Sequence, residues 1–151
     1  MAQSLARVTL LLIFGTKNRH AFLKDQTERQ KLYFYLGGIL RDLECPSLII
    51  NGMPDHTHVL FELARTASIS DVVEGLKGSS SKWVKTSMPG CRDFAWQRGY
   101  AVFSVSITSV DSVRAYIANQ EEHHRTRSYQ DEMQEFFRAH AFTDAETSFW
   151  E

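Results

Sequence analysis

Residues 53–63 read Met-Pro-Asp-His-Thr-His-Val-Leu-Phe-Glu-Leu in this 151-residue chain. The breaker residues at the start predict a turn, and the β-branched and apolar residues from His56 onward predict a strand. Strand side chains alternate between two faces, so His56 and His58 share one face, roughly 7 Å apart. They are either two hydrogen-bonded surface histidines or two ligands of one metal ion, and this short pattern alone leaves both interpretations open.

Length and composition indicate one globular domain over residues 1–151, with 43% hydrophobic and 23% charged residues. The longest apolar run, Val8 to Phe14, is too short to span a bilayer and lacks signal-peptide flanks, so we expect a cytoplasmic protein with no membrane contact. The net charge of -1 gives no global attraction to nucleic acid, although cations gather between Arg65 and Arg98. Cys45 and Cys91 lie in unrelated contexts, and we expect both to be reduced.

Alternating strand and helix patterns run through the chain. Strands are predicted over 8–14, 47–50, 56–63 and 100–107, and helices over 25–43, from 68, over 108–124 and from 128. Capping boxes are expected at 68–71 and 108–111, and Asn51-Gly52 predicts a hairpin loop somewhat longer than two residues, ending at Asp55.

The first six elements have the order βαββαβ, which is the ferredoxin-like split arrangement. We therefore expect an α+β fold, with an antiparallel sheet, helices on one face and additional C-terminal helices. In this arrangement the first and third strands are central, so the strand with His56 and His58 forms a rigid platform for a site.

Two segments combine cations with hydroxyl groups. Lys17 and Arg19 follow the first strand and either hold a phosphate or belong to a solvated loop. In the segment 77–85 lysines alternate with hydroxyls around Trp83. This composition suits a surface that follows a phosphate backbone, and equally a flexible helix end with Trp83 in the core.

Tyr116 and Gln120 are one turn apart on the predicted helix 108–124 and should share a face. A tyrosine on an amphipathic helix is also a common core residue with an exposed hydroxyl. The last helix has an apolar stripe that includes Tyr129 and Met133, and we expect this stripe to be a packing face rather than a ligand site.

Together these segments resemble the HUH-superfamily transposases with a single catalytic tyrosine, of the insertion-sequence-200/605 type, and their REP-associated relatives. The matching segments are 14–19, 51–60, 76–83, 96–100, 103–106 and 116–124, in the order that the family has. The chain departs from the family at Thr57, where a hydrophobic residue is usual, and at Gly15, where serine is more usual.

The resemblance implies DNA transposition by cleavage and rejoining of single-stranded DNA. Tyr116 would be the nucleophile that forms a covalent 5′-phosphotyrosine and releases a 3′-OH. His56, His58 and Gln120 would hold Mg²⁺ or Mn²⁺ as a Lewis acid. The covalent link would conserve the phosphodiester energy, so that the strand could be rejoined without ATP.

The resemblance also implies a homodimer and DNA that contains hairpins. The candidate DNA contacts are Lys17, Arg19, Lys77, Ser80 and Lys82. Two other functions fit the same residues. One is a domesticated protein that binds DNA hairpins without transposition, and the other is an unrelated metal-dependent phosphodiesterase in which Tyr116 is structural.

Overall fold

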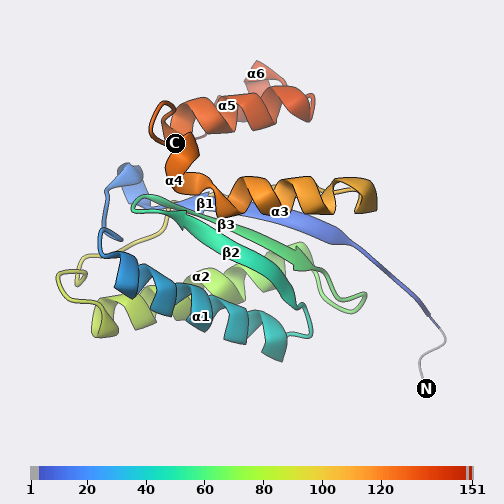
Figure 1. Cartoon of the computed structure of the whole chain (residues 1–151). Helices are drawn as coiled ribbons and strands as arrows, with labels where there is room; N and C mark the ends of the chain where they lie inside the picture. The colour runs from blue at the N-terminus through green and yellow to red at the C-terminus, as the bar shows by residue number, and fades with distance from the viewer. Residues whose placement is uncertain (1–3, 149, 151) are drawn as a thin grey trace.

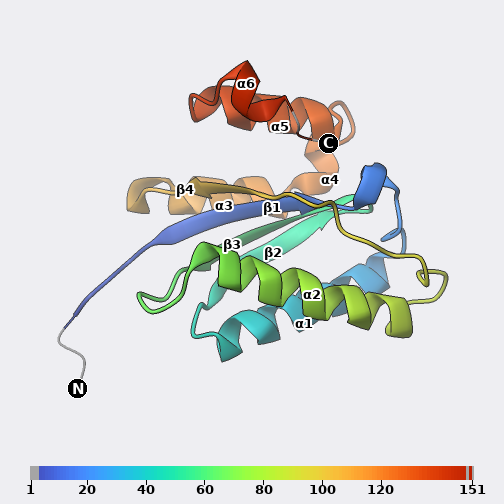
Figure 2. The same cartoon turned by 180° about the vertical axis from the view of Figure 1, so that it is seen from behind.

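A four-stranded antiparallel sheet lies between two layers of helices in the computed structural model, which describes residues 4–148 and 150 (Figures 1 and 2). The elements are β1 (Thr9–Gly15), η1 (Lys17–Arg19), α1 (Gln26–Asp42), β2 (Ser47–Met53), β3 (His56–Glu62), α2 (Ile69–Ser87), β4 (Ala101–Ser104), η2 (Ile107–Ser109), α3 (Val110–Ala118), α4 (Gln120–His123), α5 (Tyr129–Ala139) and α6 (Asp144–Thr147).

The strand order is β2-β3-β1-β4, which confirms the predicted α+β arrangement with β1 and β3 at the centre. Helices α1 and α2 cover one face of the sheet, and α3 to α6 lie on the other (Figure 1). Among the helices of the described residues, none combines the length and hydropathy needed to cross a bilayer.

Both faces of β1 are buried, which explains its continuous apolar sequence. Leu10, Leu12 and Phe14 belong to the core under α1 and α2. Leu11 and Ile13 belong to a second core under the C-terminal helices. Strand β1 therefore contributes side chains to both cores, one on each face of the sheet.

The same alternation orients β3. Val59 and Phe61 enter the core under α1 and α2, whereas Leu60 enters the second core. Because side chains two positions apart share a face, His56 and His58 point with Leu60 toward the C-terminal helices. The histidine pair is thus enclosed by a helical layer rather than exposed on an open sheet.

The hairpin before the histidine pair is tighter than predicted. Asn51 and Gly52 belong to β2, and the turn consists of Pro54 and Asp55 alone. Gly52 pairs with Thr57, and a Cβ at position 52 would lie 2.2 Å from the carbonyl oxygen of His56. The glycine is therefore needed for close approach of two backbones and not for a turn.

The predicted helix over 108–124 is also divided differently. A short 3-10 turn precedes α3, and the chain leaves helical geometry at Asn119 before α4. The prediction of a capping box at 108–111 is wrong, because α3 begins after Ser109, whose side chain caps no backbone group of the described residues. Asn51 donates from Nδ2 to the carbonyl oxygen of Ile117 at 2.9 Å, so a β2 side chain satisfies one of the last carbonyl groups of α3.

The segment 77–85 lies inside α2, which continues to Ser87. Trp83 is half-buried and stacks on Tyr35 of α1, with ring centroids 5.1 Å apart. At the N-terminus of α2 the Ser68 side chain accepts a hydrogen bond from the backbone of Asp71, which is one of the two hydrogen bonds of the predicted capping box. The segment is thus regular helix and not a flexible end.

We predict opposite effects of alanine at two glycines. Gly52→Ala should lower the free energy of unfolding by about 2–3 kcal/mol, because the new Cβ overlaps the backbone of β3. Gly78→Ala, in the middle of α2 with open space around it, should raise this free energy by about 0.5–1 kcal/mol. Urea unfolding of both variants checks this, and a Gly52→Ala protein as stable as the wild type would contradict the close approach.

Candidate active site

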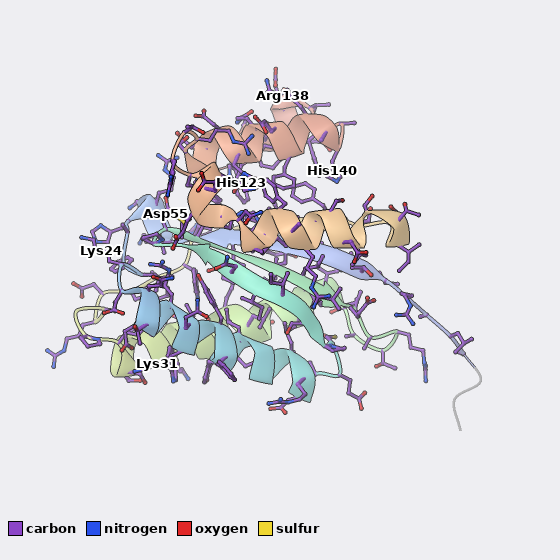
Figure 3. The ribbon with its side chains drawn as sticks, in the orientation of Figure 1. Lys24, Lys31, Asp55, His123, Arg138 and His140 are labelled. Atoms are coloured by element: carbon purple, nitrogen blue, oxygen red, sulfur yellow. The ribbon has the colours of Figure 1, made fainter. Side chains whose placement is uncertain are left out.

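The two histidines of β3 form the floor of a buried polar cluster. His56 and His58 are both 0% exposed, and their rings lie 5.3 Å apart between centroids. Asp55, in the turn, places Oδ1 2.7 Å from Nδ1 of His56. Figure 3 shows Asp55 at the end of the sheet over which α4, with His123, and α5 lie. When His56 donates from Nδ1 to Asp55, Nε2 presents a lone pair to the cluster.

Glu132 of α5 closes the cluster from above and is 1% exposed. Its Oε1 lies 2.9 Å from Nε2 of His58 and 3.5 Å from Nε2 of His56. Its Oε2 lies 3.4 Å from Nε2 of His124. One carboxylate therefore meets three imidazoles.

Gln120 and Tyr116 enter the cluster on different helices. Gln120 begins α4, and its Oε1 lies 3.1 Å from Nε2 of His56. Tyr116, on α3, donates a hydrogen bond from its hydroxyl to Oε2 of Glu132. Although the predicted continuous helix is interrupted, one chain brings Tyr116, Gln120 and both histidines to a single cluster.

Burial and charge set the protonation states in the cluster. Burial lowers the pKa of His58 below its ordinary value, so His58 is neutral at pH 7. Burial alone would raise the pKa of Glu132, but hydrogen bonds from His124 and His58 hold it well below its usual range. Burial and the hydrogen bond to Glu132 raise the pKa of Tyr116 above its ordinary value. Tyr116 is thus a protonated phenol that donates to a carboxylate.

The donor set suits a divalent cation. The ligand atoms of His56, His58 and Glu132 all lie within 4.8 Å of one another. Nε2 of His56 also faces the amide oxygen of Gln120. Lone-pair atoms that face each other need a proton or a cation between them, and imidazole nitrogens with oxygen ligands are a set that Mn²⁺ and related cations accept. His56, His58 and Gln120 therefore fit the predicted ligand set, and Glu132 adds a carboxylate.

A groove of about 350 Å³ between α3 and α5 gives access to the nucleophile candidate. Its walls include Val113, Tyr116 and Phe136. Arg127 approaches the Tyr116 hydroxyl from the same layer, with Nη2 3.4 Å away, and also pairs with Glu135. Tyr116 is half-buried and thus the part of the cluster that a substrate can reach.

Tyr129 covers His56 and is not free to act as a nucleophile. Its ring stacks on His56 with centroids 4.3 Å apart, and its hydroxyl donates to Oε1 of Gln97 at 3.1 Å. These two side chains explain the departure at Gly15, because a Cβ there would lie 2.9 Å from Gln97 Oε1 and 3.0 Å from the Tyr129 ring. A serine would require both to move.

The loop with Lys17 and Arg19 lies beside the histidine pair. Gly15 is opposite His56 in the sheet, and the next residue, Thr16, donates its backbone N–H to the carbonyl oxygen of Asp55 at 2.9 Å. Lys17 and Arg19 are both exposed. The loop therefore presents two cations at the end of the sheet where the cluster lies.

The other three predicted DNA contacts lie on α2, on the opposite side of the sheet. Lys77 donates from Nζ to backbone carbonyl oxygens of residues 97–99, and burial lowers its pKa. Ser80 is 0% exposed and accepts from Nε1 of Trp96 at 2.9 Å, so the expectation of a DNA contact at Ser80 disagrees with its position in the core. Of these three residues, Lys82 alone is exposed.

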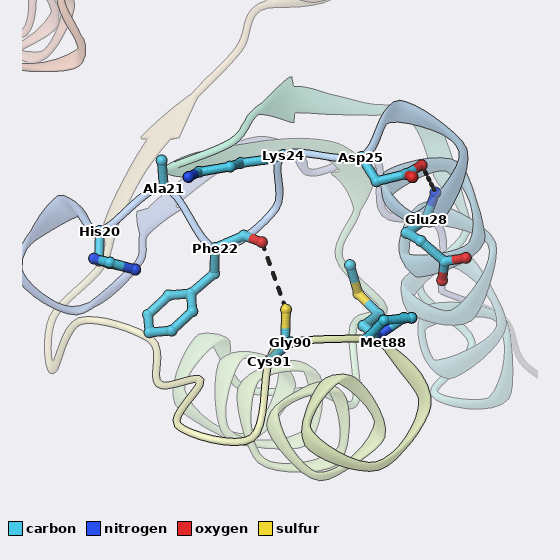
Figure 4. Close-up of a pocket in the computed structure, with 10 residues that line it drawn as sticks. His20, Ala21, Phe22, Lys24, Asp25, Glu28, Met88, Gly90 and Cys91 are labelled. Atoms are coloured by element: carbon cyan, nitrogen blue, oxygen red, sulfur yellow. Dashed lines mark hydrogen bonds between the residues drawn. The ribbon is translucent and has the colours of Figure 1, made fainter.

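Another pocket of about 350 Å³ lies on the α1 and α2 side, between the loop before α1 and the loop after α2 (Figure 4). Asp25 in its wall caps α1 by accepting from the backbone of Glu28 at 3.1 Å. Cys91 donates from Sγ to the carbonyl oxygen of Phe22 at 3.5 Å. These groups hold the wall together. Cys91 and Cys45 are both buried and unpaired.

Sequence patterns alone missed Glu132, the most connected residue of the cluster. The apolar stripe of α5 was expected to pack, and Tyr129, Met133 and Phe137 are indeed buried. Glu132 lies between Asp131 and Met133 and has the ordinary appearance of a charged helix residue. Glu132 is four residues before Phe136 and therefore lies on the same face of α5, which is the buried face. This spacing is the sequence signal that indicates burial of Glu132.

Comparison with known proteins identifies relatives over most of the chain. The family described as "Transposase IS200 like" matches residues 4–120. The ISDra2 transposase TnpA of Deinococcus radiodurans is 27% identical over 118 residues, which are 72% of this chain and 81% of that protein.

Two solved structures have a similar fold. A crystal structure described as a transposase from Deinococcus radiodurans R1 has a TM-score of 0.65 and 26% identity, over 80% of this chain and 95% of that chain. A REP-associated tyrosine transposase bound to a REP hairpin has a TM-score of 0.55 and 16% identity, over 80% of this chain and 68% of that chain. The second likeness concerns the fold alone.

The matched segment 4–120 contains the whole sheet, both histidines, Tyr116 and Gln120. It leaves out α5 and therefore Glu132. The resemblance that the sequence motifs indicated is confirmed, and the chain belongs to the IS200-like family of transposases.

Proposed function

We propose that this transposase cleaves and rejoins single-stranded DNA through a covalent 5′-phosphotyrosine at Tyr116. The observation that carries the proposal is the convergence of Tyr116, His56, His58 and Gln120 of one chain around a single buried carboxylate. The Tyr116 hydroxyl donates to the carboxylate of Glu132, whose other oxygen contacts both histidines, so the attacking oxygen and the metal-ligand candidates share one site. A merely structural tyrosine has no need of such neighbours.

In the proposed step the Tyr116 oxygen forms a bond to the scissile phosphorus while the bond from phosphorus to the 3′ oxygen breaks. The phenol loses its proton, and the departing 3′ oxygen gains one. Mg²⁺ or Mn²⁺ held by His56, His58 and Gln120 would supply Lewis-acid polarisation of the phosphate. Asp55 orients the His56 ring so that Nε2 faces the cluster.

The pKa of Tyr116 is raised above its ordinary value, so its hydroxyl does not ionise on its own at neutral pH. The phenol is protonated at neutral pH, so the site has to stabilise developing negative charge on its oxygen. Arg127, with Nη2 3.4 Å from that oxygen, is a cation in position to do so. Reversal of the same step on a new 3′-OH would rejoin strands, because the phosphotyrosine keeps the phosphodiester energy.

We further propose that the DNA reaches the cluster past Lys17 and Arg19 and carries hairpins, as the DNA of the REP-associated relative does. Two exposed cations beside the β2–β3 turn suit a phosphate backbone. The homodimer implied by the resemblance stays a prediction. Family membership leaves a hairpin-binding protein without transposition as the alternative function.

Replacement of Tyr116 tests the proposed nucleophile. Wild-type protein incubated with Mg²⁺ and single-stranded hairpin DNA should form a protein–DNA adduct that survives denaturing electrophoresis. Tyr116→Phe should form none, because it lacks the attacking oxygen, whereas Tyr100→Phe, at an exposed tyrosine outside the cluster, should behave as the wild type. An adduct with Tyr116→Phe would refute the assignment. Tight hairpin binding without any wild-type adduct would favour the alternative function.

Replacement of Lys17 and Arg19 tests the proposed DNA path. Replacing Lys17 and Arg19 together by glutamine should weaken single-strand binding. It should also reduce the slope of log K against log salt concentration by about one to two, since two phosphate contacts are lost. Lys82→Gln, at an exposed lysine on the other side of the sheet, is the matched control and should leave the slope unchanged. Equal effects of the two variants would place the DNA path elsewhere.

A further inference from the structure

The charged side chain at the centre of the cluster comes from a part of the chain that the family match does not include. Glu132 lies on α5, beyond the matched segment 4–120. Its side chain is 1% exposed and stands against β3 of the same chain. A carboxylate is rarely buried to this extent without a charged or metal partner. The contacts of its two carboxylate oxygens, Oε1 and Oε2, indicate the role of Glu132.

One oxygen of Glu132 faces the proposed metal ligands. Oε1 is 2.9 Å from Nε2 of His58 and 3.5 Å from Nε2 of His56. Nε2 of His56 is in turn 3.1 Å from Oε1 of Gln120. Neighbouring ligands of an octahedral cation with bonds of about 2.1 Å lie about 3 Å apart. These three distances match those between neighbouring ligands of one cation, and the ligand atoms of His56, His58 and Glu132 all lie within 4.8 Å of one another.

The other oxygen of Glu132 faces the proposed nucleophile. Oε2 accepts the hydrogen bond from the Tyr116 hydroxyl, and the amide nitrogen of Gln120 lies 3.5 Å from the same oxygen. The carboxylate therefore connects the histidine pair to Tyr116 through its own three atoms. This arrangement fixes the distance between the metal ligands and the attacking oxygen.

We propose that Glu132 is a fourth ligand of the divalent metal and that the same carboxylate positions Tyr116 beside it. This inference rests on the proposed function of the cluster and extends it to a residue on α5. The metal would then be held by two imidazoles, one amide and one carboxylate. Added negative charge in the ligand set favours hard cations such as Mg²⁺ and Mn²⁺.

A purely structural role for Glu132 predicts a different experimental result. The carboxylate could serve only as the buried counter-charge of the imidazoles, and in that case its removal would lower stability and leave metal affinity unchanged. Stability and metal affinity are therefore measured separately. Mn²⁺ binding without DNA, followed by the loss of the free-ion signal in electron paramagnetic resonance, reports the ligand set independently of cleavage.

The test compares wild type, Glu132→Gln, Glu132→Asp and the control Glu122→Gln, whose carboxylate is exposed on α4 and pairs with Arg125. We expect Glu132→Gln to weaken Mn²⁺ binding at least about 10-fold, a loss that changes around a metal site commonly cause. Glu132→Asp keeps the charge but shortens the reach and should also weaken binding. Glu122→Gln should bind as the wild type does. Circular dichroism identifies folded variants.

Wild-type Mn²⁺ affinity in either folded Glu132 variant would overturn the proposal, as would absence of Mn²⁺ binding by the wild type. Tyr116→Phe separates this proposal from the proposed nucleophile. It should bind Mn²⁺ as tightly as the wild type, since the phenol is not a ligand, while forming no DNA adduct. If Glu132→Gln loses Mn²⁺ affinity but Tyr116→Phe still forms the adduct, the ligand role stands and the nucleophile assignment fails.

Discussion

The burial of two imidazoles on the central strand is the constraint that shapes one half of this protein. His56 and His58 are inaccessible to solvent, so their ring nitrogens need polar partners inside the protein. Both nitrogens of His56 and Nε2 of His58 have such partners, which come from Asp55 in the turn, Gln120 at the start of α4 and Glu132 on α5. Among the described residues, Nδ1 of His58 has no hydrogen-bond partner. The C-terminal helices therefore carry polar groups into a layer that is otherwise apolar.

The two faces of the sheet differ in the residues that they bury. On the side of α1 and α2 the core is apolar, and polar groups there, such as Ser80 and Lys77, hold backbone or indole groups in place. Thr57 faces this side, and its buried hydroxyl has no hydrogen-bond partner within residues 4–148 and 150. This hydroxyl lowers the stability of the core under α1 and α2. The polar cluster around His56 and His58 lies on the other face of the sheet.

Local patterns were sufficient for most of the fold and for the histidine pair. Strand alternation predicted that His56 and His58 share a face, and the element order predicted their central position. Long-range contacts decided what local patterns left open. Gly52 lies in a strand because two backbones meet there. Glu132 lies against β3, a contact that the sequence pattern of α5 does not reveal. Tyr116 and Gln120 converge although the helix between them is interrupted at Asn119.

We propose that one chain assembles the whole site, with its own Tyr116 hydrogen-bonded to the carboxylate that contacts its own histidine pair. The most direct test is complementation between two inactive proteins, His58→Ala and Tyr116→Phe, co-expressed and purified together. Neither chain then has a complete site, so the mixture should form no covalent adduct with single-stranded hairpin DNA while the wild type does. Recovery of the adduct in the mixture would show that the site is shared between chains and would contradict the claim.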